Sequence, residues 1–402
     1  MIGKLSAKNV LRNKRRTLTT MAIITFGVSM LLLAFGHVEY IKWGLRETVI
    51  HGQTGHFQLC NKKYLENKEK RILEYGIDDW QKIAKLLTNI SYVNVVTPRI
   101  TFSGLVSTGD ISIGIMVSAV LPANEIKMGG QMVEHKAYHL FLREPYGILI
   151  GPGLAQLLSV NIGDSITLMT TTAHGSLNAM DFKVIGTVSS GFEEMDNRFA
   201  VLSLDFAQRL LASQRVERLL VGLKRTEELP LAVNATQKII PAGIKLRLWH
   251  EVDKYFWQVS AFFNQFIGFF LPVLMLIVWF STMNTVLTLI LERSPELATL
   301  RAIGTSNWRL LRLLFSEGML IGITSVVLGI LLELGFSVLC NCFHITLPTP
   351  PGYTESYHFI IRNIWKNYVF VSLLTLAIVS LSTLIPARRI FKMNIVKTLR
   401  GV

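Results

Sequence analysis

The sequence predicts an α-helical membrane protein with four transmembrane helices plus a large extracytoplasmic α+β domain. Half of the 402 residues are hydrophobic and only 17% are charged, a composition that excludes an ordinary soluble enzyme. Four runs with few or no charged residues are each long enough to cross the roughly 30 Å hydrocarbon layer as a helix. A stretch of mixed residue pattern between the first two runs has the size of a folded domain.

The four runs divide the chain into nine segments. The first run is an uncleaved anchor rather than a signal peptide, because its apolar part exceeds the about 7–15 residues of a signal-peptide core. The third run is interrupted only by Glu317 and Glu333. The predicted segments are a basic elbow helix (1–16), the first span (17–40), the outer domain (41–254), the second span (255–291), a short helix and connector (292–312), the third span (313–343), an outer loop (344–366), the fourth span (367–387) and a tail (388–402).

Basic residues are concentrated beside the spans. Residues 1–16 contain six Lys and Arg and residues 387–402 contain five, and neither end contains an acidic residue. Since short segments rich in Lys and Arg stay in the cytoplasm, both termini and the connector 292–312 are predicted to be cytoplasmic. The outer domain, with 24 basic and 21 acidic residues, lies on the opposite side. The net charge of +14 therefore indicates contact with anionic membrane lipid and no nucleic acid.

The outer domain alternates short strands with short helices in two lobes, and turn-forming residues separate them. Predicted helices cover residues 78–87, 154–158, 205–212 and 228–239, and predicted strands cover 55–60, 92–96, 111–120, 148–150, 165–169, 182–188, 200–204, 218–223 and 244–248.

Two of these strands form a predicted β-hairpin. Ser165–Met169 pairs with Phe182–Val188 across a polar loop, so the tip of the hairpin is predicted to project. A projecting loop is either a solvated connection or a docking site for a partner, and both interpretations stay open. The candidate docking residues are Thr171, Thr172, His174, Gly175, Ser176, Leu177 and Asn178.

The chain lacks the common signatures of enzymes. It has no GxxxxGK[ST] loop for ATP phosphates, no GxGxxG fingerprint, no GxSxG elbow and no HExxH pair. Cys60, Cys340 and Cys342 have no ligand spacing, and His135 and His139 have no carboxylate or thiolate partner at ligand spacing. No catalytic residue, metal site or cofactor is therefore predicted in this chain.

Two acidic residues fall inside the third span, where ionisable groups are costly and often functional. Glu317 lies near the cytoplasmic end, where we expect it to meet water or Arg309 and Arg312. Glu333 lies in the other half, and either a functional role or a solvated cavity would explain it.

Residues 294–304 predict a short cytoplasmic helix. Ser294 is the expected N-cap, Pro295 takes the first helical position, and Gly304 follows the end. An apolar face on such a helix requires either a protein partner or the lipid interface. The residues predicted to share that face are Leu297, Leu300 and Ile303.

Residues 291–304, LERSPELATLRAIG, followed by LFSEG at 314–318, resemble the signature of the FtsX-like permease family of ABC transporters. NVLRNKRRTL at 9–18 is similar to the basic elbow of the family, and LIPARR at 384–389 with IVKTLR at 395–400 is similar to its closing motif. The outer segments 147–151, 154–155, 160–168 and 182–187 resemble the MacB-like periplasmic domain of MacB-like and lipoprotein-releasing members.

This resemblance implies a permease subunit of the bacterial inner membrane. In the family, two identical or different permease chains pair, and each binds a separate cytoplasmic ABC ATPase subunit that holds ATP and Mg. The short cytoplasmic helix docks in the ATPase, and ATP-driven closure is transmitted through the spans to the outer domains. The implied coupling residues are Glu292, Arg293, Glu296, Leu297, Leu300, Arg301, Ile303 and Gly304.

Six apolar residues of the second span are spaced three or four apart, so they form one helical stripe. Such a stripe usually meets lipid or a neighbouring helix, and between two paired chains it also suits an acyl-chain groove. The residues of this predicted cargo-facing stripe are Phe262, Phe266, Phe269, Val273, Ile277 and Phe280.

Three functions fit the resemblance. The favoured one is extraction of lipoproteins or similar hydrophobic cargo from the outer leaflet for a periplasmic carrier, although the predicted hairpin lacks the prolines of the carrier-recruiting loop. The second is MacB-like efflux with an adaptor and an outer-membrane channel, although such chains usually carry a fused ATPase. The third is a mechanotransmitter that switches a periplasmic cell-wall hydrolase, although its outer domain is typically much smaller.

Overall fold

The computed structural model describes residues 14–67, 74–129, 136–349 and 357–388. The predicted basic elbow up to residue 13, the tail from residue 389, and His135 lie outside these ranges. The described residues form two compact units. The membrane unit contains residues 14–41, 260–346 and 358–388, and the domain contains residues 42–259 with 347–349 and 357.

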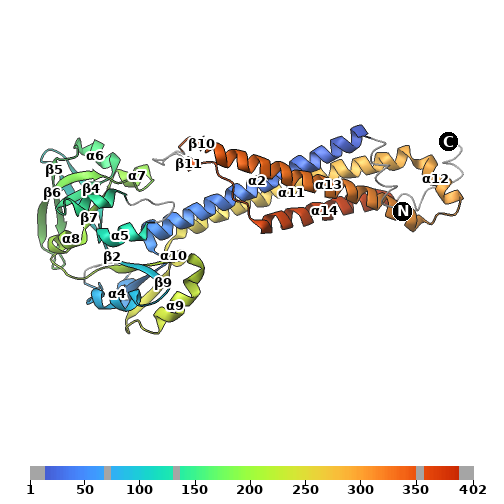
Figure 1. Ribbon diagram of the computed structural model, residues 1–402. Coiled ribbons are helices and arrows are strands. Elements are labelled where there is room, and N and C mark those ends of the chain that lie inside the picture. The colour runs from blue at the N-terminus through green and yellow to red at the C-terminus, as the bar shows by residue number, and fades with distance from the viewer. Residues whose placement is uncertain (1–13, 68–73, 130–135, 350–356, 389–402) are drawn as a thin grey trace. The chain divides into compact units, whose positions relative to one another are not determined.

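Four long helices run alongside one another in the membrane unit (Figure 1). Among the described residues, these four are long and apolar enough to cross a membrane. They are α2 (Lys14–Val49), α11 (Lys254–Glu292), α13 (Asn307–Phe343) and α14 (Trp365–Ala387), and the short helix α12 (Ser294–Ala302) joins α11 to α13.

The helices touch through a narrow apolar core. Its members include Ile24 and Val28 on α2, Val278 on α11, and Val379 on α14. A Cβ at Gly329 on α13 would stand 2.9 Å from the carbonyl oxygen of Thr25, so this glycine allows the close approach of α2. Only 17–33% of the most apolar window of each span is buried inside the chain, which leaves most of each surface for lipid or another protein.

The first helix is longer than the predicted span. The charges of Lys42, Arg46 and Glu47 end the apolar run near residue 40, but they do not break a helix. α2 therefore continues to Val49, and a π-helix, η1 (Ile50–Thr54), follows it directly.

The domain is built on a nine-stranded sheet in the order β3-β7-β4-β6-β5-β2-β8-β1-β9, with β3 also paired to β2. The strands are β1 (Phe57–Asn61), β2 (Val93–Ser107), β3 (Ser112–Val120), β4 (Gly147–Ile150), β5 (Ser165–Thr171), β6 (Leu177–Thr187), β7 (Phe199–Ser203), β8 (Arg218–Leu223) and β9 (Ile244–Leu248). The helices are α3 (Lys62–Glu66), α4 (Trp80–Thr88), α5 (Pro122–Met128), η2 (Lys136–Leu142), α6 (Pro152–Leu158), α7 (Glu193–Asp196), α8 (Leu204–Leu211), η3 (Thr226–Glu228), α9 (Leu229–Gln237) and α10 (Trp249–Val252), and β10 (Thr346–Leu347) pairs with β11 (Tyr357–His358) in a separate two-stranded sheet.

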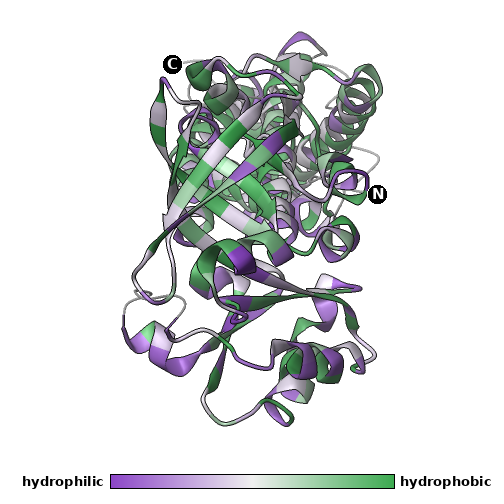
Figure 2. Cartoon of the chain, turned by 90° about the vertical axis from the view of Figure 1, so that its left-hand side faces the viewer, coloured by the Kyte–Doolittle hydropathy of each residue, from purple (hydrophilic) through white to green (hydrophobic). Residues whose placement is uncertain are grey.

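The extra pairing of β2 with β3 closes β2, β3, β7, β4, β6 and β5 into a ring, which forms one lobe. The other lobe consists of β8, β1 and β9, attached to residues 93–99 of β2. Along the strands, hydrophobic and hydrophilic residues alternate, as in β5, because one face of the sheet is buried (Figure 2). The predicted α+β domain is confirmed, and β2 is the strand that connects the ring to the β8, β1 and β9 lobe.

β2 is much longer than the predicted strand 92–96 and continues through Pro98. The carbonyl of Arg99 accepts from the amide of Glu217 on the β8 side. Since successive residues of a strand point their amides to opposite sides, the missing N–H of Pro98 faces away from β8. Pairing with β3 begins only at Arg99, so the missing N–H of Pro98 breaks no ladder hydrogen bond.

The Gly151-Pro152-Gly153 turn allows two backbone segments to approach closely. A Cβ at Gly151 would overlap the carbonyl oxygen of Asp196, at the end of α7. We expect Gly151→Ala to lower the free energy of unfolding by about 1–3 kcal/mol, because the backbone has to move to make room. Gly114→Ala in β3 is the matched control, because no atom lies within 4 Å of a Cβ there. Equal thermal unfolding midpoints of the two variants would contradict the expected clash.

A buried histidine in the domain is held in its neutral form. His56 is 1% exposed, and its Nδ1 accepts a hydrogen bond of 3.1 Å from the amide of Leu223. The proton of the neutral ring therefore lies on Nε2, which donates to Oγ1 of Thr226 at 3.1 Å. Burial lowers the pKa of His56 from 6.5 to about 4.

This histidine makes the domain sensitive to acid. Between pH 6.5 and 4, the unfolded chain binds a proton that the folded His56 does not bind, so stability falls as the pH falls through this window. From pH 7 to pH 5 the expected loss from this group is about 2 kcal/mol. Urea unfolding at both pH values, followed by tryptophan fluorescence, measures it. His56→Gln should reduce the pH dependence by this amount, and an unchanged dependence in the variant would be inconsistent with a neutral His56.

Candidate functional site

The short helix between the second and third spans is built as the sequence predicts, except at its first residue. Ser294 begins α12 rather than capping it, and its hydroxyl donates to the carbonyl of Leu291 at 2.9 Å. Pro295 lies in the first turn, where a missing amide hydrogen costs nothing. Gly304 takes a φ of +92° after the helix, a conformation that glycine adopts without strain.

The three apolar residues of this helix do not share one face. Leu297 is 0% exposed and packs with residues of α11 and α13. Leu300 is half-buried, and Ile303 is 74% exposed. At 3.6 residues per turn, positions six apart differ by about 120°, so a spacing of three and three drifts around the helix. The prediction that all three residues face a partner is therefore wrong for Leu297, which the chain itself covers.

A buried ion pair fixes the start of α12 to α13. Nη1 of Arg293 lies 3.1 Å from both carboxylate oxygens of Glu317, and Nε lies 3.1 Å from Glu296. Arg293 is 8% and Glu317 is 4% exposed. Burial alone would lower the pKa of Arg293, but the adjacent Glu317 and Glu296 outweigh it and raise this pKa. Glu317 was expected to meet water or Arg309 and Arg312. Its partner in the structure is Arg293.

A second ion pair joins α2 to the end of α11. Nη1 of Arg16 lies 3.1 Å from the carboxylate of Glu292, and both side chains are partly exposed. Such an exposed pair contributes little stability, about 0–1 kcal/mol. Its geometric consequence is that four elements, α2, α11, α12 and α13, meet at this end of the membrane unit.

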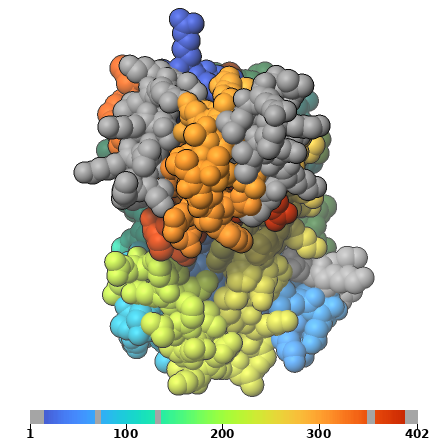
Figure 3. Space-filling view, turned by 90° about the vertical axis from the view of Figure 1, so that its right-hand side faces the viewer, coloured from blue at the N-terminus to red at the C-terminus, as the bar shows by residue number. Residues whose placement is uncertain are grey.

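The surface of α12 and of the start of α13 that faces away from the spans is exposed (Figure 3). Trp308, at the start of α13, is 67% exposed and lies close in sequence to Ile303. Trp308 lies beyond the predicted helix 294–304 and was not among the predicted site residues; a tryptophan in a short basic connector was the available signal. Arg301 is half-buried. The exposed residues from Leu291 to Arg309 are Leu291, Glu292, Pro295, Glu296, Thr299, Ala302, Ile303, Gly304, Ser306, Trp308 and Arg309.

The six predicted cargo-facing residues of the second span are all exposed in this chain. Their exposed fractions run from 41% at Val273 to 67% at Phe269. The buried positions of α11, such as Met275 and Val278, lie between them on other faces and pack in the membrane core. The structure therefore places Phe262, Phe266, Phe269, Val273, Ile277 and Phe280 outside the bundle core.

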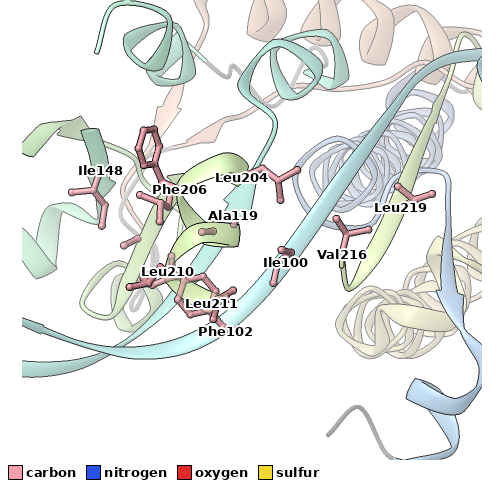
Figure 4. Packing of buried hydrophobic residues seen from close by; sticks show 14 of the residues in the cluster. Ile100, Phe102, Ala119, Ile148, Leu204, Phe206, Leu210, Leu211, Val216 and Leu219 are labelled. Carbon is pink, nitrogen blue, oxygen red and sulfur yellow. The ribbon is translucent and has the colours of Figure 1, made fainter. Parts of the chain in front are cut away.

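The predicted hairpin forms, but its partner strand begins closer to the loop than predicted. Ser165–Met169 pairs with residues 179–183, so only Phe182 and Lys183 of the predicted partner 182–188 lie opposite it. The tip of the hairpin does not project, and that prediction is wrong. The amide of Ala173 donates to the carbonyl of Leu211, and Nδ2 of Asn178 donates to the carbonyl of Leu210. These carbonyls end α8, whose labelled apolar side chains Phe206, Leu210 and Leu211 belong to the core (Figure 4).

The hairpin tip is thus held against the domain, and it still offers a small surface. The strands extend to Thr171 and from Leu177, so the loop is shorter than predicted. Thr172 and Asn178 are half-buried. The exposed members of the candidate docking set are Thr171, His174, Gly175, Ser176 and Leu177.

Glu333 lies inside the membrane unit rather than on its surface. It is 1% exposed, and its Oε2 accepts a hydrogen bond of 2.6 Å from the hydroxyl of Tyr368 on α14. One turn away, Ser337 donates to Asn363 at 3.1 Å. These polar contacts join α13 to the start of α14. Across the described ranges, no cluster of three or more His, Cys, Asp or Glu residues is suited to a metal ion.

Two family models match this chain. A family model described as FtsX-like permease C-terminal matches residues 268–395, and one described as MacB-like periplasmic core domain matches residues 17–239. The periplasmic region of MacB from Actinobacillus actinomycetemcomitans is similar over 49% of this chain and 89% of that chain, with 11% identity and a TM-score of 0.35.

Curated relatives come from several bacteria. The lipoprotein-releasing system transmembrane protein LolC of Neisseria meningitidis serogroup B is 22% identical over 79% of this chain and 76% of its own length. The lipoprotein-releasing system transmembrane protein LolE of Haemophilus influenzae is 23% identical over 80% of each chain. Because the MacB-like model alone spans more than half of the chain and the permease model covers most of the rest, this protein belongs to the FtsX-like permease family with a MacB-like periplasmic core domain.

Proposed function

We propose that this chain is the permease subunit of an ATP-driven transporter whose ATP is hydrolysed by a separate cytoplasmic ABC ATPase. The supporting observation is the end of the membrane unit around α12. The buried Arg293–Glu317 pair and Leu297 fix the side of α12 that faces the spans. The opposite side exposes Ile303, and Trp308 is exposed nearby. Exposed apolar and aromatic side chains on a rigid support are typical of a protein docking surface.

This division assigns two roles to the coupling residues. Ile303 and Trp308 contact the ATPase, with Glu292, Glu296 and Gly304 around them. Arg293 and Leu297 position the helix, because both are buried within this chain. Arg301 and Leu300 lie between the two groups. The +5 and +6 charges at the ends support a cytoplasmic position of both termini and of this surface.

Two such chains form the transporter, either as identical copies or as a pair of related chains. The second span supports this pairing, because only 17% of its most apolar window is buried within one chain. Phe262, Phe266 and Phe269 then lie at a wide apolar surface between chains, where acyl chains of a cargo fit. The cargo is a lipoprotein-like or other hydrophobic molecule taken from the outer leaflet, a class suggested by the lipoprotein-releasing relatives.

The direct test uses purified protein with its ATPase in liposomes that carry a lipidated protein. We expect release of the lipidated protein only when ATP is hydrolysed, and no release with an ATPase mutated in its catalytic glutamate. Isolation of the complex from native membrane identifies the second permease chain and any carrier or adaptor. Intact ATP hydrolysis without release would refute the proposed cargo class, and co-isolation of an adaptor would favour efflux instead.

The exposed hairpin residues are the candidate contact for a periplasmic carrier or adaptor. Replacing Ser176 and Leu177 with Lys should weaken recruitment of that partner by about tenfold, because Leu177 is 76% exposed and offers a compact apolar contact. ATP hydrolysis should stay unchanged. Pull-down of the partner together with an ATPase assay measures both, and Asp110→Lys, in a different exposed turn of the domain, is the control. If the wild type, the hairpin variant and the Asp110→Lys control bind the partner equally, the hairpin is not the docking site.

A further inference from the structure

The helix that enters the domain ends in an unusual way. Its last turn is the π-helix η1, closed by a hydrogen bond of 2.9 Å from the amide of Gly55 to the carbonyl of Ile50. The end of any helix leaves carbonyl groups without an intrahelical donor. π-helical turns are rare, and they occur often at functional positions.

A buried guanidinium takes up the free carbonyls of η1. Arg99 is 6% exposed, and its Nη1 donates to the carbonyls of Gly52 at 2.9 Å and Gln53 at 3.2 Å. Its Nη2 donates to Oε2 of Glu125 at 2.7 Å. Glu125 is fully buried, and its other oxygen accepts from the hydroxyl of Thr97 at 3.0 Å. We call these contacts the Arg99 clamp.

The clamp holds the helix at a mechanically central position. Arg99 is the residue at which β2 changes partners, since it pairs with Arg218 of β8 and with Val120 of β3. β2 in turn connects the closed ring to the second lobe. A displacement of the η1 carbonyls therefore reaches both lobes through one strand.

The segment by which the chain leaves the domain, at α10, contacts the same helix end. The amide of Trp249, which begins α10, donates to the carbonyl of His56 at 3.2 Å. The Trp249 side chain packs with Val49 and Ile50 at the end of the first helix. The entering and leaving segments are thus joined in one buried cluster beside the clamp.

A simple helix cap does not require this arrangement. Capping needs one exposed donor, whereas a buried Arg–Glu pair carries a large desolvation cost that only good geometry offsets. The cation does complement the negative end of a helical run of 40 residues. What the pair adds over a cap is a rigid, directional connection from the helix end to β2.

We infer that Arg99, oriented by Glu125, is the positioning residue that transmits displacement of the first helix to both lobes of the domain. The inference rests on the proposed function, because it names the contact through which ATP-driven motion reaches the cargo side. Glu125 acts through Arg99, and neither residue needs to touch the cargo.

The test uses the full chain with its ATPase in liposomes and compares two clamp variants. Arg99→Met with Glu125→Gln removes both charges together, so that no buried charge is left unpaired. Arg99→Lys keeps a charge beside Glu125 but offers one ammonium in place of a planar fork. For both variants we expect ATP hydrolysis within about twofold of the wild type and about tenfold less lipidated protein released per ATP. Asp78→Asn with Arg215→Met, which removes an exposed ion pair of the same domain, should match the wild type.

A second measurement, which does not depend on the cargo, accompanies this comparison of variants. Hydrogen–deuterium exchange of the β2 amides should change between the nucleotide-free and the ATP-trapped wild-type complex, and this change should be lost in both clamp variants. If the variants release cargo per ATP as the wild type does and show only a lower unfolding midpoint, the clamp is structural and the inference is overturned. If the wild type shows the exchange change but releases no lipidated protein, the cargo proposal fails and the clamp stands. Absence of any nucleotide-dependent change in the wild type overturns the clamp.

Discussion

Replacing Ile303 with Asp is expected to abolish stimulation of the ATPase while the permease stays folded. Ile303 is 74% exposed, so the new carboxylate remains in water in the free chain, and stability should change by only about 0.5 kcal/mol. In the complex the same charge would be buried against the partner, which should weaken binding by about 2 kcal/mol or more. Trp308→Ala should weaken binding by a similar amount through the loss of aromatic contact area.

The matched control is the same substitution on the inner side of the helix. Leu297→Asp places a carboxylate among apolar residues of α11 and α13 and should cost about 3 kcal/mol or more of folding stability. Thermal unfolding in detergent and co-purification of the ATPase separate the two effects. An Ile303→Asp chain that binds and stimulates the ATPase normally would show that the docking surface lies elsewhere.

The membrane architecture was accessible from the sequence because its cause is local. A missing charge over about 20 residues is sufficient to predict a span, whatever the span packs against. The helical connector was accessible for the same reason, since Pro295 and Gly304 mark its ends within the segment itself. The limit appears in the first helix, which continues through Lys42 and Arg46, because charge ends an apolar run without ending a helix.

The errors concern contacts between residues distant in the sequence. The hairpin tip was predicted to project, but the carbonyls that hold Ala173 and Asn178 belong to α8, which comes more than 30 residues later. The predicted strand 92–96 covers only the start of β2, because only the pairing with β8 and β3 reveals that the strand continues through Pro98. Local residue preference alone cannot supply either fact, since both depend on which neighbour occupies the space beside the segment.

The candidate site shows the same division between local and distant information. The acidic residue in the third span was visible as an anomaly, but its partner was expected among the nearby basic residues Arg309 and Arg312. The structure brings Arg293 to it from 24 positions earlier, across the turn made by α12. The ion pair therefore explains two observations at once: an acid tolerated near the end of a span, and a short helix held at a defined angle to it.

Breaking this ion pair is the second large effect that we expect. Glu317→Ala leaves the buried Nη1 of Arg293 without its carboxylate partner and should lower stability by about 3–5 kcal/mol, and Arg293→Ala should have a comparable effect. The double variant Arg293→Met with Glu317→Met should recover much of the loss, because neither charge is left unpaired and the methionine side chains fill the space.

Stability and coupling should separate in that double variant. The ion pair is the directional contact between α12 and α13, whereas methionine packing leaves the angle of the helix less defined. We therefore expect a near wild-type unfolding midpoint together with ATPase stimulation reduced by about tenfold. Thermal unfolding and ATP hydrolysis by the reconstituted complex measure the two quantities. A double variant that is both stable and fully coupled would indicate that apolar packing around Leu297 alone orients the helix.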